Sequence, residues 1–169
     1  MKYYAGIGSR ETPGRIKYDM TEIALQLEEK DYVLRSGHAP GADQAFERGA
    51  DRADIWVPWS KFEQHVPYPK FVTLHIGSSP EAFELAEKFH PRWKYISQGA
   101  KKLIARNGHQ ILGKNLTSPV QFVVCWTKDG KEVGGTAQGI RIAKHYGIPV
   151  YNLGDESGER LKEEILNGP

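Results

Sequence analysis

The chain has 169 residues, a length that fits one domain and can bury a core without a disulfide or metal staple. Hydrophobic residues make up 39% of the sequence and charged residues 26%, a balance that excludes a disordered or fibrous protein. The net charge of +2 excludes a polycation that coats nucleic acid indiscriminately, and the single Cys125 excludes a disulfide framework and a multi-cysteine zinc site.

Along the chain, short apolar segments alternate with segments whose apolar residues recur every three or four positions. The first pattern predicts strands and the second predicts helices. Strands are expected at residues 2–7, 32–36, 54–59, 120–126 and 149–153. Helices are expected at residues 16–30, 43–52, 80–90, 96–111, 134–146 and 156–167. Residues 60–79 contain two prolines and several aromatic residues, and we expect them to be irregular.

This alternation predicts an α/β fold, a doubly wound and mainly parallel sheet flanked by helices. Residues 120–126 are the most apolar segment and are expected to form an inner strand that is buried on both faces. We find no repeat and no linker, so residues 1–169 are expected to form a single domain. In such a fold, ligands bind in the crevice outside the carboxyl ends of the strands.

A glycine-rich loop follows the first strand. It contains Gly8, Ser9 and Arg10, directly before the first predicted helix. Glycines let a backbone approach a ligand closely, free N–H groups near a helix start bind anions, and the arginine fork suits phosphate. The loop is not a complete dinucleotide fingerprint. It is therefore interpreted either as a phosphate site or as a tight turn with a surface arginine.

A second loop follows the second strand and contains Ser36, Gly37, His38, Gly41 and Asp43. In one interpretation the two glycines lie against a phosphate or a ribose, and the aspartate orients the loop or a sugar hydroxyl. In the other, the aspartate caps the next helix and the histidine packs in the interior.

Two further sites lie near predicted helices. Arg106 and Asn107 belong to the basic helix, where they could hold a phosphate together with a base or ribose edge, or could form an exposed helix surface. Gly134, Gly135 and Thr136 open a helix after the inner strand. A helix N-terminus of this kind is the simplest phosphate site in the sequence, and the alternative is a plain glycine turn.

Charge is distributed unevenly along the chain. Residues 89–128 contain seven lysines and arginines and no aspartate or glutamate. This basic segment predicts either a face that binds a polyanion or a solvated helix with counter-charges elsewhere in the fold. In the first case Trp93 and Tyr95 could stack on bases. The residues then expected to contact a nucleic-acid backbone are Lys101, Lys102 and Lys114.

In their order and their placement at strand ends, the four loops resemble the Rossmann-like core of the DNA-processing protein A family, part of the wider SLOG group. The resemblance runs from about Tyr3 to Leu153. It implies a pocket for a nucleotide or single-stranded DNA, and related domains commonly pair, so a homodimer is a candidate assembly. The residues implied in binding are Gly8, Ser9, Arg10, Ser36, Gly37, Gly41, Asp43, Arg106 and Asn107.

The chain departs from that family in two respects. The family's Arg-Asn-Arg run reads Arg-Asn-Gly-His at residues 106–109. The length also leaves no room for the helical N-terminal domain and the winged-helix C-terminal domain of typical members, so a stand-alone form is expected.

The SLOG group also contains the LOG phosphoribohydrolases, which cleave the N-glycosidic bond of nucleoside monophosphates. Those enzymes carry a glutamate just after the Gly-Gly-Thr turn, whereas residues 137–139 here are Ala-Gln-Gly. Hydrolysis would need another carboxylate, such as Glu132 or Asp43. We therefore expect binding without turnover, with the nucleotide N-glycosidase as the alternative.

Other classes of function are not supported by the sequence. It has no H-E-x-x-H, Walker or G-x-S-x-G motif, and we expect neither a metal nor a cofactor. No apolar run approaches the roughly 18 residues of a membrane span, and residues 1–4 lack a signal-peptide core. A cytoplasmic protein without membrane contact is expected.

Overall fold

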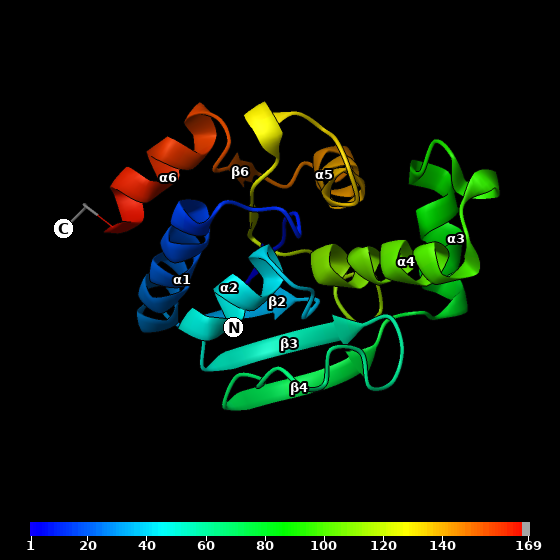
Figure 1. Ribbon diagram of the computed structural model, residues 1–169, viewed down its shortest axis with the longest axis horizontal. Helices are drawn as coiled ribbons and strands as arrows, with labels where there is room; N and C mark the ends of the chain where they lie inside the picture. The colour runs from blue at the N-terminus through cyan, green and yellow to red at the C-terminus, as the bar shows by residue number, and fades with distance from the viewer. Residues whose placement is uncertain (167–169) are drawn as a thin grey trace.

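The computed structural model describes residues 1–166, in which strands and helices mostly alternate (Figure 1). The strands are β1 (Lys2–Gly6), β2 (Tyr32–Ser36), β3 (Arg52–Val57), β4 (Phe71–Ile76), β5 (Phe122–Cys125) and β6 (Val150–Asn152). The α-helices are α1 (Gly14–Glu29), α2 (Ala42–Gly49), α3 (Pro80–Phe89), α4 (Gln98–Leu112), α5 (Thr136–His145) and α6 (Glu156–Leu166). Two short 3-10 helices are η1 (Trp93–Tyr95) and η2 (Lys128–Gly130).

The strands form one sheet in the order β4-β3-β2-β1-β5-β6, and every neighbouring pair is parallel. From β1 the chain winds outward through β2 and β3 to β4, and later fills the other side with β5 and β6. The predicted doubly wound α/β fold is therefore confirmed. Its order reverses between β1 and β5, which is the switch point where this architecture opens a crevice.

Helices cover both faces of the sheet. One apolar cluster joins β1 through Tyr4 and β2 through Leu34 to helices α1, α2 and α6. The other joins β1 through Ala5 and β5 through Val123 to helices α4 and α5, and α3 packs on the outside of α4 (Figure 1). Because side chains alternate along a strand, neighbouring residues of β1 enter opposite clusters.

Helix α1 is held by a narrow apolar stripe. Met20, Ile23, Ala24 and Leu27 recur at helical spacing and are almost completely buried against the sheet and α2. Phe46 of α2 is fully buried in the same cluster. Each large apolar side chain buried in this way contributes roughly 1.5–3 kcal/mol to folding.

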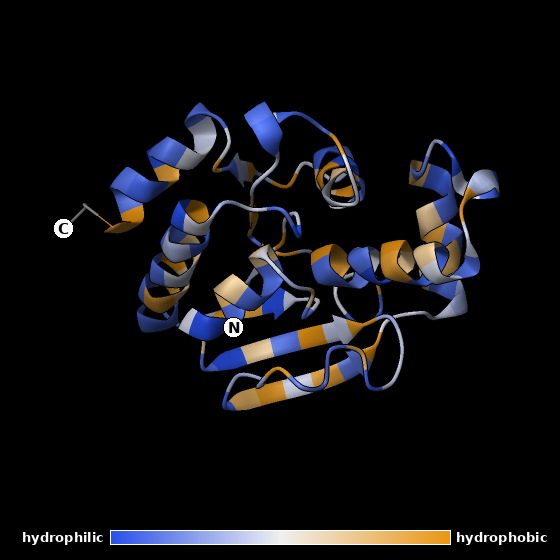
Figure 2. Ribbon diagram, viewed as in Figure 1, coloured by the Kyte–Doolittle hydropathy of each residue, from blue (hydrophilic) through white to orange (hydrophobic). Residues whose placement is uncertain are grey.

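The helices and most strands lie where periodicity predicts them, with three differences. Strand β4 was expected to be irregular, but residues 71–76 form the outermost strand of the sheet. Its pattern is weak because this edge strand is mostly exposed, although Figure 2 shows hydrophobic residues along much of it. Helix α2 ends at Gly49 and not at the predicted residue 52, and strand β3 begins and ends two residues earlier than predicted. The predicted last helix is confirmed to residue 166, and residue 167 lies outside the described part of the chain.

Two further expectations concern the interior and the membrane. Cys125 is fully buried at the end of β5, and burial raises the pKa of its thiol to about 12, so it is no reactive nucleophile. None of the helices in residues 1–166 is long and apolar enough to cross a membrane.

Candidate functional site

A cavity of about 730 Å³ opens at the carboxyl ends of β1, β2 and β5, at the switch point of the sheet. Its walls come from residues 7–11 after β1, the start of α2, residues 103–110 of α4, and the segments 126–128 and 133–136 on either side of η2. This is the position predicted for a ligand in a doubly wound fold. The predicted loops after β1 and β2 and the predicted turn before α5 meet there, together with Arg106 and Asn107 of α4.

The loop after β1 is held rigidly by its own hydrogen bonds. Ser9 Oγ accepts from the N–H of Glu11 at 2.9 Å, and the Ser9 carbonyl accepts from Thr12 Oγ1 at 2.6 Å. A side chain at Gly8 would lie 2.5 Å from the Cβ of Ala42, so the loop can lie this close to α2 only with glycine at position 8. The loop therefore offers a fixed backbone to the cavity.

Arg10 projects from this loop and lines the cavity. It is exposed and forms no ion pair or hydrogen bond with any described residue. Its guanidinium is thus free to pair with an anion, for which its planar fork is suited.

Two glycines of the second loop are required by packing. Gly41 has a φ of +90°, and a Cβ there would lie 2.6 Å from the carbonyl oxygen of Ser9. A Cβ at Gly37 would lie 2.6 Å from the guanidinium carbon of Arg106. Both glycines allow the loops around the cavity to pack together, and neither is among the residues that line it.

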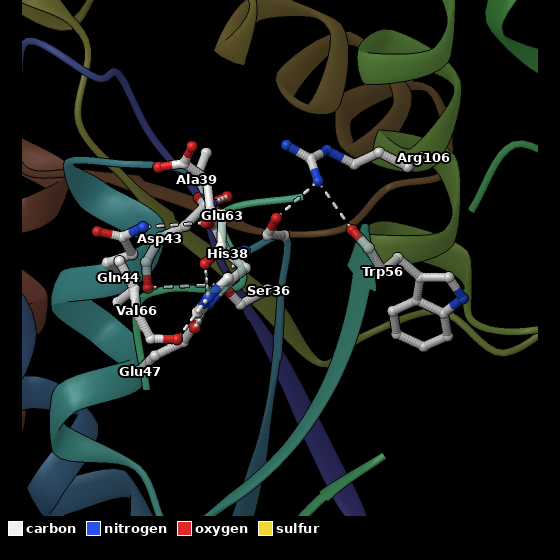
Figure 3. Close-up of polar contacts among 11 residues, drawn as sticks. Ser36, His38, Ala39, Asp43, Gln44, Glu47, Trp56, Glu63, Val66 and Arg106 are labelled. Carbon is white, nitrogen blue, oxygen red and sulfur yellow. Dashed lines mark hydrogen bonds and ion pairs between the residues drawn. The ribbon is translucent and has the colours of Figure 1, made fainter. Parts of the chain in front are cut away.

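Ser36 and His38 lie in a buried polar cluster (Figure 3). Ser36 Oγ donates to Glu47 at 2.6 Å, and the ring of His38 contacts the same carboxylate at 2.5 Å. The other ring nitrogen of His38 faces the carbonyl oxygens of Glu63 and Val66 at 3.0 and 3.2 Å. The structure does not bring these two side chains to the cavity, because Glu47 and the backbone occupy their polar atoms.

The surroundings of His38 in this cluster favour its protonated form. Burial alone would lower the pKa of His38, but the hydrogen bond and the charge of Glu47 outweigh it, so the pKa is raised. Both ring nitrogens face oxygen atoms that can accept a hydrogen bond, an arrangement that the protonated ring satisfies. The His38–Glu47 pair therefore fixes the loop after β2, the role that the packing interpretation predicts.

Arg106 joins the ends of two strands. Its Nη1 atom donates to the carbonyl oxygens of Gly37 at 2.7 Å and Trp56 at 2.8 Å (Figure 3). The side chain is only 5% exposed and still lines the cavity. Burial lowers its pKa, an effect opposed by Asp43 and Glu47, and a guanidinium stays charged under such conditions. It is a fixed positive charge in the cavity wall.

Asp43 adds a buried carboxyl group to the same cavity. The predicted capping role is wrong, because α2 begins at Ala42 and Gly41 precedes it as the cap. Asp43 lies in the first turn, and its carboxylate accepts from the N–H of Ala39 at 3.3 Å. Burial raises its pKa to about 7, with Arg106 opposing and Glu47 adding to the rise.

The turn before α5 forms the opposite wall. Gly134 has a φ of +71°, and added Cβ atoms at Gly134 and Gly135 would meet nothing within 4 Å. Asn107 Nδ2 donates to the carbonyl oxygen of Gly135 at 3.4 Å, which connects α4 to this turn. Thr136 begins α5 and lines the cavity. The N–H groups of the next two residues donate to the carbonyl oxygens of Gly134 and Gly135 at 3.2 and 3.4 Å, so the N–H of Thr136 and the positive end of the helix dipole are what this turn offers an anion.

Several predicted residues lie elsewhere. Lys101 and Lys102 are half-buried near the start of α4, next to the cavity wall that begins at Leu103. Lys114 does not share that surface, because it follows α4 and lines a second cavity. Glu132 is exposed and pairs with Lys144 at 3.2 Å, outside the first cavity.

Gln138 occupies the region where the LOG enzymes carry their glutamate, but it is 1% exposed and does not line the cavity. Its amide donates to the Ala86 carbonyl at 3.1 Å and accepts from Arg141 at 2.9 Å. A carboxylate at this position would lie in the packing between α5 and α3, so it could not act on a ligand.

Sequence reasoning missed part of the cavity wall. Gln110 of α4 and Trp126, Thr127 and Lys128 after β5 also line it. The last three follow an inner strand directly, and the carboxyl ends of parallel strands meet at one edge of a sheet. That position was the signal that could have identified them.

No protein-family model matches the chain, and no curated protein sequence matches it. Among solved structures, it is similar to the DNA processing protein A of Helicobacter pylori, described for its mode of binding single-stranded DNA. The match covers 96% of this chain and 72% of that chain, with a TM-score of 0.59 and 17% sequence identity. The chain therefore has the Rossmann-like α/β fold that is found in DNA processing protein A.

Proposed function

We propose that this chain binds single-stranded DNA, with a backbone phosphate in the cavity between β1 and β5. One observation carries the proposal: the cavity joins the free guanidinium of Arg10, the fixed guanidinium of Arg106 and the first turn of α5. Two guanidinium groups and the N-terminus of a helix are the groups that proteins use to bind phosphate.

Features beside the cavity favour a polymer over a free nucleotide. Lys101 and Lys102 lie in the turn of α4 next to the cavity wall. Near them, η1 presents Tyr95, which is 78% exposed and has the Arg92 guanidinium 5.6 Å from its ring centre. The ammonium group of Lys101 lies 5.4 Å from the ring centre of Trp93 in the same short helix. Exposed aromatic residues among cations stack on bases, at about 1–3 kcal/mol per base. The fold shared with a protein described as binding single-stranded DNA adds support.

Fluorescence anisotropy with a labelled oligothymidylate tests this proposal. The wild type should bind the single strand more tightly than a duplex of equal length or thymidine monophosphate. Affinity should fall with salt at a log–log slope of roughly −0.7 per neutralised phosphate. Arg10→Ala should weaken binding, whereas Arg15→Ala, an exposed arginine of α1 outside the cavity, should not.

The result that contradicts the proposal is an affinity for the single strand that does not depend on salt. Equal loss of binding in Arg10→Ala and Arg15→Ala would also contradict it, because a general effect of surface charge would then replace the cavity. Tighter binding of the mononucleotide would leave the cavity as a site for a free nucleotide.

One observation favours the nucleotide N-glycosidase as a second candidate. Asp43 lies in the cavity with a pKa raised by burial, which suits an acid or base near neutral pH. We propose binding without hydrolysis, because the described residues of the turn before α5 bring no carboxylate to the cavity, and its second lining carboxylate, Glu11, lies in the loop after β1. Chromatography of nucleoside monophosphates after incubation should show no free base. Release that Asp43→Asn abolishes would favour the enzyme.

A single domain over residues 1–169 and a homodimer stay predictions. Analytical ultracentrifugation of the full chain measures the assembly directly. One species of about twice the chain mass of 19.0 kDa is the result expected for a homodimer.

A further inference from the structure

A second cavity, of about 500 Å³, lies away from the proposed DNA site at the carboxyl ends of β3 and β4. It is bordered by these two strands, the start of α3 and the end of α4. The residues that matter here are Trp56, His75, Ser79, His109, Lys114 and Asn115. None of them lines the first cavity.

A serine and a histidine are paired in this cavity. Ser79 Oγ lies 3.1 Å from Nε2 of His109, and Nδ1 of the same ring lies 3.0 Å from the carbonyl oxygen of Gly113. A carbonyl can only accept, so the ring hydrogen is on Nδ1 when the imidazole is neutral. The lone pair on Nε2 is then free to accept the hydroxyl proton of Ser79.

The ring that accepts this proton is held in place from two sides. His109 is 5% exposed, and its plane lies 7° from that of Trp56 with the ring centres 5.9 Å apart. Its Nδ1 contact spans the last turn of α4 to Gly113. A nucleophile, a base within hydrogen-bond reach and a third group that orients the base are the signature of an activated hydroxyl.

Capping alone does not account for this arrangement. Ser79 is the N-cap of α3, and its Oγ accepts from the N–H of Ala82 at 3.1 Å. That bond occupies a lone pair of the hydroxyl and leaves its proton to be donated. The proton is directed to a base whose tautomer is fixed, at the wall of a cavity large enough for a small molecule.

We propose that Ser79 and His109 form a nucleophile–base pair that hydrolyses small carboxylic esters in the second cavity. As Ser79 Oγ bonds to the ester carbonyl carbon, its proton passes to Nε2 of His109. The bond to the alcohol oxygen then breaks, and that oxygen takes the proton from His109. Lys114 and Asn115 line the same cavity, and their side chains carry N–H groups that can donate to the carbonyl oxygen as negative charge develops on it.

Water completes the reaction. Its oxygen attacks the acyl carbon while one of its protons passes to Nε2 of His109. The bond between Ser79 Oγ and the acyl carbon then breaks, Oγ takes that proton back from His109, and the acid is released. The net change is ester plus water to acid plus alcohol, and no other reactant is required.

The test uses the full-length protein and two probes, p-nitrophenyl acetate and a biotinylated fluorophosphonate. The fluorophosphonate forms a bond from the serine oxygen to phosphorus and releases fluoride, so peptide mapping of the wild type identifies the reactive serine. We expect the adduct at Ser79. His109→Gln should slow labelling and acetate release by about 100-fold or more, the usual contribution of a general base.

Ser78→Ala is the matched control, because it removes the neighbouring hydroxyl and should leave both reactions unchanged. Ser79→Ala should abolish them, and Ser79→Asn keeps a residue type that caps helices while removing the nucleophile. Wild-type protein that stays unlabelled at Ser79 would overturn the proposal, as would labelling that His109→Gln does not slow. Peptide mapping is done on the wild-type protein, so its result does not depend on whether a variant folds. Anisotropy with oligothymidylate tests the proposed DNA site in a separate experiment.

Discussion

Asp43 provides a quantitative prediction about stability. Burial raises the pKa of this carboxyl from 3.8 to about 7, and the nearby charge of Glu47 adds to the rise while Arg106 opposes it. Between these two values the native state holds a proton that the unfolded chain has released. The difference of about three pH units, at about 1.4 kcal/mol each, corresponds to about 4 kcal/mol.

The sign follows from proton uptake. Because the native state binds the extra proton, the contribution of Asp43 is most favourable below pH 3.8 and is lost as the pH rises through about 7. Asp43→Asn removes the titrating group and keeps an oxygen that can accept from the N–H of Ala39. The variant should match the wild type in acid and exceed its stability by up to about 4 kcal/mol at about pH 8.

Urea unfolding of both proteins at about pH 5, 6, 7 and 8 measures this difference. Glu132→Gln serves as the control, since it also replaces a carboxylate by an amide but does so at an exposed position. A stability difference between Asp43→Asn and the wild type that is the same at every pH would refute the reasoning. The carboxyl would then be ionised in the native state at all these pH values.

Three further predictions concern residues in the cavity wall or beside it. Arg10→Lys should weaken binding of oligothymidylate and leave the melting temperature unchanged, because the side chain is exposed; a large fall in melting temperature with intact affinity would show a structural role. Gly41→Ala should lower the free energy of unfolding by about 1–3 kcal/mol in urea, since φ is positive and the Cβ meets Ser9, whereas Gly14→Ala has open space and should not. Lys101→Ala should reduce the salt slope of DNA binding by less than about one unit, and an unchanged slope would remove this lysine from the backbone path.

The fold could be predicted because its signals are local. Apolar residues at helical spacing located the helices, and the short apolar strands between them implied the parallel sheet. Strand β4 was missed because it lies at the edge of the sheet, where Phe71, Leu74 and Ile76 stay exposed and no clean alternation develops. The alternation of apolar and polar residues therefore does not identify a strand whose side chains are mostly exposed.

The site was predictable in outline but not in the roles of its residues. Loops at the ends of β1 and β5 could be placed together because topology alone brings them to one edge. The partner of Ser36 and His38 is Glu47, on the next helix, and nothing local in the sequence marks that carboxylate as buried. Arg106 donates to Gly37 and Trp56, 69 and 50 residues away, contacts that only the folded chain reveals.

The account rests on phosphate binding in the cavity between β1 and β5. An NMR titration of isotopically labelled protein with a short oligothymidylate tests this directly, because backbone amides report contact residue by residue. We expect the largest shifts at Gly8, Ser9 and Arg10 and at Gly135 and Thr136, the two walls that face each other across the cavity. Shifts confined to other surfaces, such as the exposed edge of β4, would contradict the account.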